Sequence, residues 1–332
     1  MAAPVVARAA RRILHFTNPA DPRSLVAETL EQRDLGTGNP SAPVGMVGVY
    51  GGGRGGKSAL CSMLSGTATD GWDGGVFRVS SRSEPCTLGV EACLPGEEIE
   101  ALARRAAVGG RPVIAVSPAL ARGSVLFCDF EGTGDQGADY STTLAVPAVC
   151  LSPVLLFNSM SGLRRADTLA ALVVLASAAE RAGGPAGLGH LHIVGRNYGA
   201  EEAKGDARFE DAYAAAYLES PLTLLGDEPT DFGGPASQRN EQRRRIRSAF
   251  TSVRLWLLPD PLIEGGIHKP IFFRRVGDLL HAVATQVSRR VGRAGGLPGG
   301  PIHSLLQSRL RAHRHHSSSV ATSSQPASSL HC

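Results

Sequence analysis

The sequence of 332 residues predicts an α/β fold, in which a mostly parallel central sheet carries helices on both faces. Apolar runs bounded by turn residues indicate strands at residues 44–50, 125–129, 154–157, 191–194 and 253–258. Helical patterns alternate with these runs, most clearly at residues 164–181 and 274–290. Strands and helices that alternate in this way form parallel sheets, and such sheets bind ligands at the carboxyl ends of their strands.

The first predicted strand leads into a glycine-rich loop with the spacing G-x-x-x-x-G-K-S, closed by Gly56, Lys57 and Ser58. In such loops backbone N–H groups surround phosphates, the Lys bridges the outer two, and the Ser hydroxyl binds Mg²⁺. A helix that begins near Lys57 points its positive end at the anion. An accidental match is the alternative, because the chain holds 40 glycines, but only three of its 34 basic residues are lysines. We therefore predict a P-loop NTPase fold, with phosphate contacts from Gly51, Gly53, Gly55, Gly56, Lys57, Ser58 and Ala59.

The composition suits one large domain, because 42% hydrophobic residues can supply a sizeable core. The net charge of +4 is spread among acidic residues and gives no indication of specific nucleic-acid binding. Six cysteines without C-x-x-C spacing, with Cys61 and Cys128 in apolar contexts, indicate a reducing compartment and no zinc site. No run of 18 or more apolar residues occurs, so we expect no membrane span and an intracellular, cytoplasmic protein.

Both ends of the chain differ from the rest. Residues 1–40 are expected to form an N-terminal extension, whose first sixteen residues fit a frayed basic terminus or, as an alternative, an organelle transit peptide. Residues 293–332 turn to Gly and Pro and then to Arg, His and Ser, a composition typical of a disordered tail with solvated histidines. The domain between them, residues 41–292, is expected to carry an inserted short helix and turn at residues 96–122.

A carboxylate follows the second predicted strand, in the sequence Asp129-Phe130-Glu131-Gly132. Behind a phosphate-binding loop, Asp129 is predicted to hold Mg²⁺ through water and the Gly132 N–H to contact the γ-phosphate. Taken alone, this tetrapeptide would be read as a turn. Thr87 lies in a polar segment before this strand, and we predict that it completes the Mg²⁺ coordination only when the γ-phosphate is present.

These motifs, in this order, resemble the GTPase domain of the guanylate-binding protein and atlastin family, large GTPases of the dynamin superfamily. The resemblance covers about residues 44–290, which makes residues 41–292 a GTPase domain of this type. Arg54 stands where the family has an Arg two residues before the Gly-Lys-Ser. The other matching segments are Thr87-Leu88-Gly89, Asp129-Phe130-Glu131-Gly132, Phe157-Asn158-Ser159 after an acidic loop, and the basic helix at residues 244–250.

The resemblance implies Mg²⁺-dependent hydrolysis of GTP to GDP, coupled to pairing of two G domains as a homodimer. It also implies that Arg54 is an arginine finger supplied in cis, because a planar cation over the phosphates neutralises charge in the transition state. A solvent-exposed loop arginine is the alternative. The implied catalytic residues are Arg54, Lys57 and Thr87, and the implied metal ligands are Ser58, Thr87 and Asp129.

Three departures from the family leave other functions open. Arg196-Asn197 stand where an Arg-Asp pair reads guanine, and an Asn amide presents a donor where a carboxylate would accept, so relaxed base specificity is expected. Pro85 replaces a hydroxyl that helps to orient the attacking water, and no helical stalk follows the last helix. A nucleotide-binding scaffold with weak catalysis is therefore the alternative. A small-molecule kinase with residues 243–247 as its lid is less well supported than a solvated Arg-rich helix.

Overall fold

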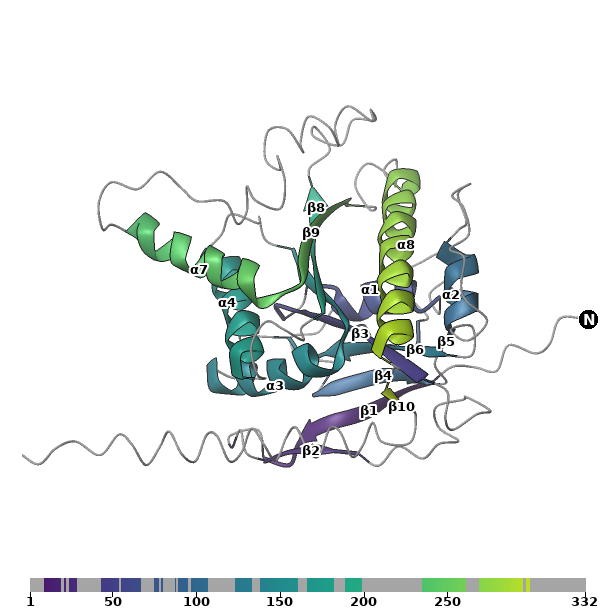
Figure 1. Ribbon diagram of the computed structural model, residues 1–332, viewed down its shortest axis with the longest axis horizontal. Helices are drawn as coiled ribbons and strands as arrows, with labels where there is room; N and C mark the ends of the chain where they lie inside the picture. The colour runs from purple at the N-terminus through teal and green to yellow at the C-terminus, as the bar shows by residue number, and fades with distance from the viewer. Residues whose placement is uncertain are drawn as a thin grey trace, which may run out of the picture.

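The protein is described here from a computed structural model. The described residues are 9–18, 21, 24–28, 43–53, 55–66, 75–77, 79, 87, 89–94, 97–106, 123–132, 138–160, 166–181, 189–198, 235–260, 269–294 and 297–298. Within them, ten strands form one sheet with the order β2-β1-β4-β6-β3-β7-β8-β9, while β10 pairs with β3 and β5 with β6. Figure 1 shows this sheet running through the centre of the molecule.

All five predicted strands are confirmed, and they lie side by side. In sheet order they are β6 (Ser124–Phe130), β3 (Pro43–Gly51), β7 (Val154–Ser159), β8 (His190–Tyr198) and β9 (Ser252–Pro259). Each neighbouring pair is parallel. β6 and β7 are buried along their whole length, which explains why they appear in the sequence as continuous apolar runs.

The other strands are antiparallel and were not predicted. β4 (Val90–Leu94), β1 (Ala9–Phe16) and β2 (Leu25–Ala27) extend the sheet beyond β6. The two-residue strands β5 (Glu97–Glu98) and β10 (Leu297–Pro298) pair with the first residues of β6 and β3. The sheet is therefore mixed, with a parallel half that holds the glycine-rich loop and an antiparallel edge.

Helices cover both faces of the sheet, as predicted. One face, called the α1 face, packs against α1 (Lys57–Leu64), α2 (Ile99–Ala106) and α8 (Lys269–Ala294). The opposite α3 face packs against α3 (Ala138–Leu151), α4 (Ala166–Arg181) and α7 (Pro235–Ala249). The two groups of helices lie on opposite sides of the sheet in Figure 1. The expected helices at residues 164–181 and 274–290 correspond to α4 and α8, and the short inserted helix expected within residues 96–122 is α2.

The predicted domain boundaries need correction. Residues 9–16 and 25–27, assigned to an N-terminal extension, are strands of the same sheet, and Ile13 and Leu14 are fully buried in its core. The frayed-terminus interpretation, which concerned the first sixteen residues, is therefore wrong for residues 9–16. At the other end α8 continues to Ala294 and β10 pairs with β3, so the domain passes the predicted limit at residue 292. The remainder of the predicted tail lies outside the described residues.

The strand order makes β3 the topological switch point of the parallel half of the sheet. The chain reaches β6 on one side of β3 and then crosses through α3 to β7 on the other side. At such a switch point the helices leave toward opposite faces, so the carboxyl end of the central strand is open between them. The glycine-rich loop begins at this point.

Side-chain alternation determines what faces the loop. Val125 and Phe127 of β6 pack on the α1 face, so Asp129 two residues later projects to the same face. By the same period, Asn158 of β7 follows Val154 and Leu156, and Arg196 of β8 follows Val194, all on the α1 face. Three parallel strands thus end in polar side chains on the face where α1 begins.

Candidate functional site

The loop between β3 and α1 has a backbone that requires glycine at its two ends. Gly51 has φ of +147° and Gly56 has φ of +71°, both in regions that side chains disfavour. A Cβ at Gly51 would lie 2.1 Å from the carbonyl oxygen of Asn158, and one at Gly56 would lie 2.3 Å from Nη1 of Arg196. The loop therefore rests directly on the ends of β7 and β8.

A third close contact with the loop comes from Gly132, which lies two residues after the end of β6. A Cβ at Gly132 would lie 2.3 Å from the Cα of Gly53 and 3.0 Å from Nζ of Lys57. Gly132, predicted to contact a γ-phosphate, therefore meets the loop backbone and the lysine ammonium. Lys57 is the first residue of α1 and is 6% exposed, and its ammonium donates to the carbonyl oxygen of Gly52 at 2.9 Å. The loop thus closes around the Lys57 ammonium.

Asp129 joins the predicted metal ligands to one another. Ser58 Oγ donates to Asp129 Oδ2 at 2.6 Å, and Thr87 Oγ1 donates to the same oxygen at 2.8 Å. Asp129 is fully buried, and its other oxygen, Oδ1, has no hydrogen-bond partner among the described residues. Burial raises the pKa of this carboxyl, while the charge of Lys57 and the two hydroxyl donors lower it. The three residues predicted to hold a metal ion are therefore brought together by the fold.

This donor set fits Mg²⁺ in kind. Carboxylate and hydroxyl oxygens are hard ligands of the type that Mg²⁺ takes, and Mg²⁺ sites commonly use only one or two carboxylates. The buried, unpartnered Oδ1 of Asp129 is an acceptor that a metal-bound water could satisfy. In the part of the chain that the structure describes, no group of three or more His, Cys, Asp or Glu side chains is arranged as a metal site.

Glu131 is a site residue that the sequence interpretation missed. Its backbone N–H donates to Gly89 O at 2.8 Å, and its Oε2 accepts the Gly89 N–H at 2.8 Å. The Tyr140 hydroxyl donates to the same carboxylate oxygen. Glu131 is 2% exposed, so this clasp is buried and ties the segment of Thr87 and Gly89 to the end of β6. The available signal was a second carboxylate two residues after Asp129, behind the apolar run at residues 125–128.

Asn158 and Arg196 lie beneath the loop, on the side of the sheet. Asn158 Nδ2 donates to Gly55 O at 2.5 Å, and Arg196 Nη1 donates to Gly56 O at 2.9 Å. Burial lowers the pKa of Arg196 to about 10, opposed by the negative charge of Asp260, so the guanidinium stays charged at neutral pH. Arg196 was predicted to read a base, and in this structure its guanidinium contacts the loop. Asn158 belongs to the Phe157-Asn158-Ser159 motif, from which the sequence predicts no role for its side chain.

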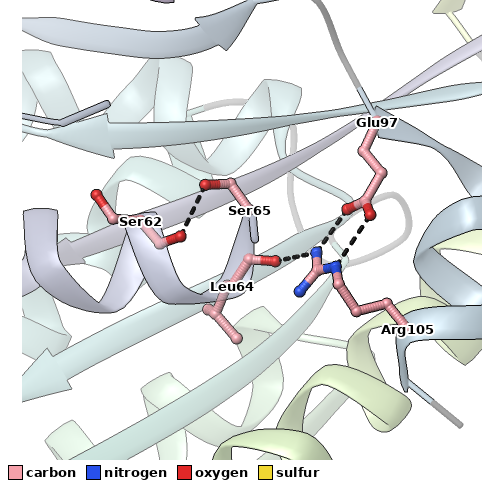
Figure 2. A network of polar contacts seen from close by, with 5 residues as sticks. All are labelled: Ser62, Leu64, Ser65, Glu97 and Arg105. Carbon is pink, nitrogen blue, oxygen red and sulfur yellow. Dashed lines mark hydrogen bonds and ion pairs between the residues drawn. The ribbon is translucent and has the colours of Figure 1, made fainter. Parts of the chain in front are cut away.

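The far end of α1 is fixed as well, as Figure 2 shows. Arg105 of α2 donates to the carbonyl oxygen of Leu64 in the last turn of α1. The same guanidinium pairs with Glu97, with Nε to Oε1 at 3.0 Å and Nη2 to Oε2 at 2.5 Å. A cation at this end compensates the negative pole of the helix dipole. Ser65 Oγ donates to Ser62 O at 3.0 Å in the same turn, so the direction of α1 toward the loop is set at both ends.

The remaining predicted residues are Gly53, Arg54, Gly55, Ala59 and Asn197, together with Pro85. Ala59 is buried in the first turn of α1, and Gly53 and Gly55 lie in the loop. Arg54 and Pro85 lie outside the described residues. Asn197 belongs to β8, but its side chain is outside the description.

No protein-family model matches this chain, and no curated protein matches it significantly. Among the described helices, none combines the length and the apolar character of a membrane-spanning segment.

Proposed function

We propose that this protein adopts a P-loop NTPase fold and catalyses Mg²⁺-dependent hydrolysis of GTP. The observation that carries the proposal is the Ser58–Asp129–Thr87 arrangement beside the Lys57 ammonium. Burying a carboxylate, two hydroxyls and a lysine ammonium together costs folding free energy, because these groups lose their hydration. Such a cluster is characteristic of functional sites.

The phosphates would be held by the loop and the start of α1. The positive end of α1 and the loop amides favour an anion, and Lys57 supplies a point charge among these dipoles. The ammonium donates to the Gly52 carbonyl oxygen, and a phosphate oxygen would replace this oxygen as its acceptor. The close approach of Gly132 to Gly53 would place the Gly132 N–H at the outer phosphate.

Ser58, Thr87 and Asp129 would hold the Mg²⁺. When bound, this ion neutralises charge on the phosphate oxygens and so stabilises the transition state. Ser58 and Thr87 can keep donating their hydroxyl protons to Asp129 while their lone pairs face the ion. The segment of Thr87 is joined to the end of β6 through Asp129 and Glu131, so Thr87 would be held next to the ion.

The proposal that the nucleotide is GTP, and that two G domains pair, rests on the resemblance to the guanylate-binding protein and atlastin family. In that comparison Arg54 would act as the arginine finger and two G domains would pair when GTP is bound. A P-loop arginine stabilises charge that develops on the phosphates in the transition state.

A second candidate is a nucleotide-binding scaffold with weak catalysis and relaxed base specificity. It is favoured by the position of the Arg196 guanidinium, which contacts Gly56 O instead of being directed to a base. With Arg196 engaged, Asn197 would be the remaining member of the predicted base-reading pair, and its amide does not match guanine as a carboxylate would.

One experiment separates these candidates. Purified protein is incubated with GTP, ATP or XTP, with Mg²⁺ or with a chelator, and the release of phosphate and the affinity for each nucleotide are measured. Mg²⁺-dependent release from GTP supports the GTPase. Binding of all three nucleotides with little release supports the scaffold, and no binding of any nucleotide contradicts both.

A further inference from the structure

Two side chains hold the carbonyl groups at the end of the glycine-rich loop. Asn158 Nδ2 lies 2.5 Å from Gly55 O, and Arg196 Nη1 lies 2.9 Å from Gly56 O and 3.5 Å from Gly55 O. Asn158 is fully buried and Arg196 is 7% exposed. Both donors come from the carboxyl ends of parallel strands, β7 and β8, on the α1 face.

The planar trans peptide bond means that these contacts also fix the directions of the loop N–H groups. In a trans peptide the C=O and the following N–H point in opposite directions. The Gly55 carbonyl shares its plane with the Gly56 N–H, and the Gly56 carbonyl shares its plane with the Lys57 N–H. When both carbonyl groups are directed at the sheet, the N–H groups of Gly56 and Lys57 are directed to the side of the loop that faces away from the sheet.

We propose that Arg196 and Asn158 are positioning residues that hold the Gly56 and Lys57 amides in the orientation needed to bind phosphate. This inference rests on the proposed function and refines it. It assigns Arg196 to the phosphate end of the ligand, whereas the sequence assigned it to the base. Neither residue touches phosphate in this account, and both act through the loop backbone.

The contacts fit a positioning role because they are made from buried, fixed side chains. A Cβ at Gly56 would meet Arg196 Nη1 at 2.3 Å, so the guanidinium and the loop are in close contact. The charge of Arg196 strengthens its bond to a carbonyl compared with a neutral donor. Gly56 O also accepts the Leu60 N–H at 3.0 Å in the first turn of α1, so the same carbonyl links β8, the loop and the helix.

The test uses inorganic tripolyphosphate, which has phosphates and no base, beside GTP and XTP. Affinities are measured for the wild type, Arg196→Met and Arg196→Lys. Arg254→Met is the matched control, because Arg254 is an exposed arginine on the neighbouring strand β9. Arg196→Met is expected to fold, since Gly56 O keeps Leu60 N and Gly55 O keeps Asn158 Nδ2 as donors. Thermal unfolding checks this.

A positioning role predicts that Arg196→Met weakens tripolyphosphate and GTP by the same factor, at least about tenfold, or about 1.4 kcal/mol. The GTP to XTP affinity ratio should stay unchanged, and Arg196→Lys should recover part of the loss because it keeps a charged donor. Unchanged tripolyphosphate binding with an altered GTP to XTP ratio would make Arg196 a base reader and overturn the inference. An equal loss in Arg254→Met would also overturn it, because general charge would then explain the effect.

A second variant keeps the test decisive if Arg196→Met is unstable. Asn158→Ala removes the donor to Gly55 O without removing a charge, and it should weaken tripolyphosphate and GTP equally, by about fivefold or more. Full tripolyphosphate affinity in this variant would contradict the inference. A wild-type protein that binds neither GTP nor tripolyphosphate would overturn the proposed function and this inference with it, whereas normal wild-type binding with unaffected variants would overturn the inference alone.

Discussion

Ser58 donates a 2.6 Å hydrogen bond to Asp129, and this bond joins the first turn of α1 to the end of β6. Thr87 adds a second donor to the same carboxylate oxygen, so one buried group connects three separate segments. Asp129→Ala should lower the free energy of unfolding by about 2–4 kcal/mol, because two hydroxyl donors lose their acceptor. Asp129→Asn keeps an acceptor and should cost less, but should weaken Mg²⁺ affinity by about 10- to 100-fold. Urea denaturation and Mg²⁺ titration of turnover measure the two effects, and equal stability of both variants would contradict this account.

The Glu131 clasp should matter for stability as well. Glu131→Ala leaves the Gly89 N–H and the Tyr140 hydroxyl without their buried acceptor, so we expect a loss of about 2–4 kcal/mol in unfolding free energy. Tyr140→Phe removes one donor and leaves the Gly89 bond, and should cost about 1 kcal/mol. Chemical denaturation of the two variants makes the comparison. A larger loss for Tyr140→Phe than for Glu131→Ala would contradict this account, because one hydroxyl donor would then contribute more than the carboxylate that accepts both donors.

The strands β6 and β7 in the parallel half of the sheet could be predicted because they are buried on both faces. Such strands appear as uninterrupted apolar runs, as in residues 154–157 of β7. The antiparallel edge could not be predicted in the same way. β1 (Ala9–Phe16) contains two arginines and β4 (Val90–Leu94) a glutamate, so polar residues interrupt both strands and neither appears as a continuous apolar run. α3 was missed for a different reason, since it is buried all round and shows no 3.6-residue period.

Within the site, the sequence motifs predicted which side chains come together, but they did not predict all of the contacts that these side chains make. The loop motif and the strand that ends near Asp129 can each be recognised from a short stretch of sequence, and the fold brings Ser58, Thr87 and Asp129 together as expected. The position of the Arg196 guanidinium depends on the distance between β8 and the loop, which are 140 residues apart in sequence. No local pattern encodes that distance, although the alternation in β8 places Arg196 and His192 on the same face.

His192 provides a pH-dependent test of the packing between the sheet and α8. Trp256 Nε1 donates to His192 Nδ1 at 2.7 Å, so the ring proton lies on Nε2, which faces Gln286 Oε1 at 2.5 Å. Burial lowers the pKa of His192 to about 4, against the effect of the Gln286 hydrogen bond and with smaller contributions from the charges of Arg254 and His190. The folded protein therefore holds His192 neutral where an unfolded chain would protonate it.

The sign of the pH effect follows from this shift. Between pH 4 and about 6.5 the unfolded chain binds the proton more readily, so stability should fall as the pH drops through this window and be constant above it. The loss should be on the order of 2–3 kcal/mol over the window. Denaturation at pH 7 and pH 5 compares the wild type with His192→Gln, which cannot titrate. The same pH slope in both proteins would remove His192 as the cause.

Arg54 is tested as the arginine finger implied by the family resemblance. Arg54→Ala should reduce GTP turnover by about 10³ and leave GTP affinity within a few fold, because the charge acts mainly in the transition state. Single-turnover kinetics and equilibrium binding give the two numbers. Parallel losses in both would mean that Arg54 only anchors the bound phosphates, and unchanged turnover would place it in solvent.

The measurement that tests the central claim most directly is GTP binding by Lys57→Ala. Lys57 is the first residue of α1, and its ammonium lies inside the loop against Gly52 O. Its removal takes away the point charge that would bridge the outer phosphates, whereas Lys57 belongs to neither of the two hydrophobic core clusters of the sheet. Calorimetric titration should show that GTP affinity falls by at least about a hundredfold, with an unchanged circular dichroism spectrum. Wild-type affinity for GTP in a folded Lys57→Ala protein would contradict the assignment of this loop as the phosphate-binding site.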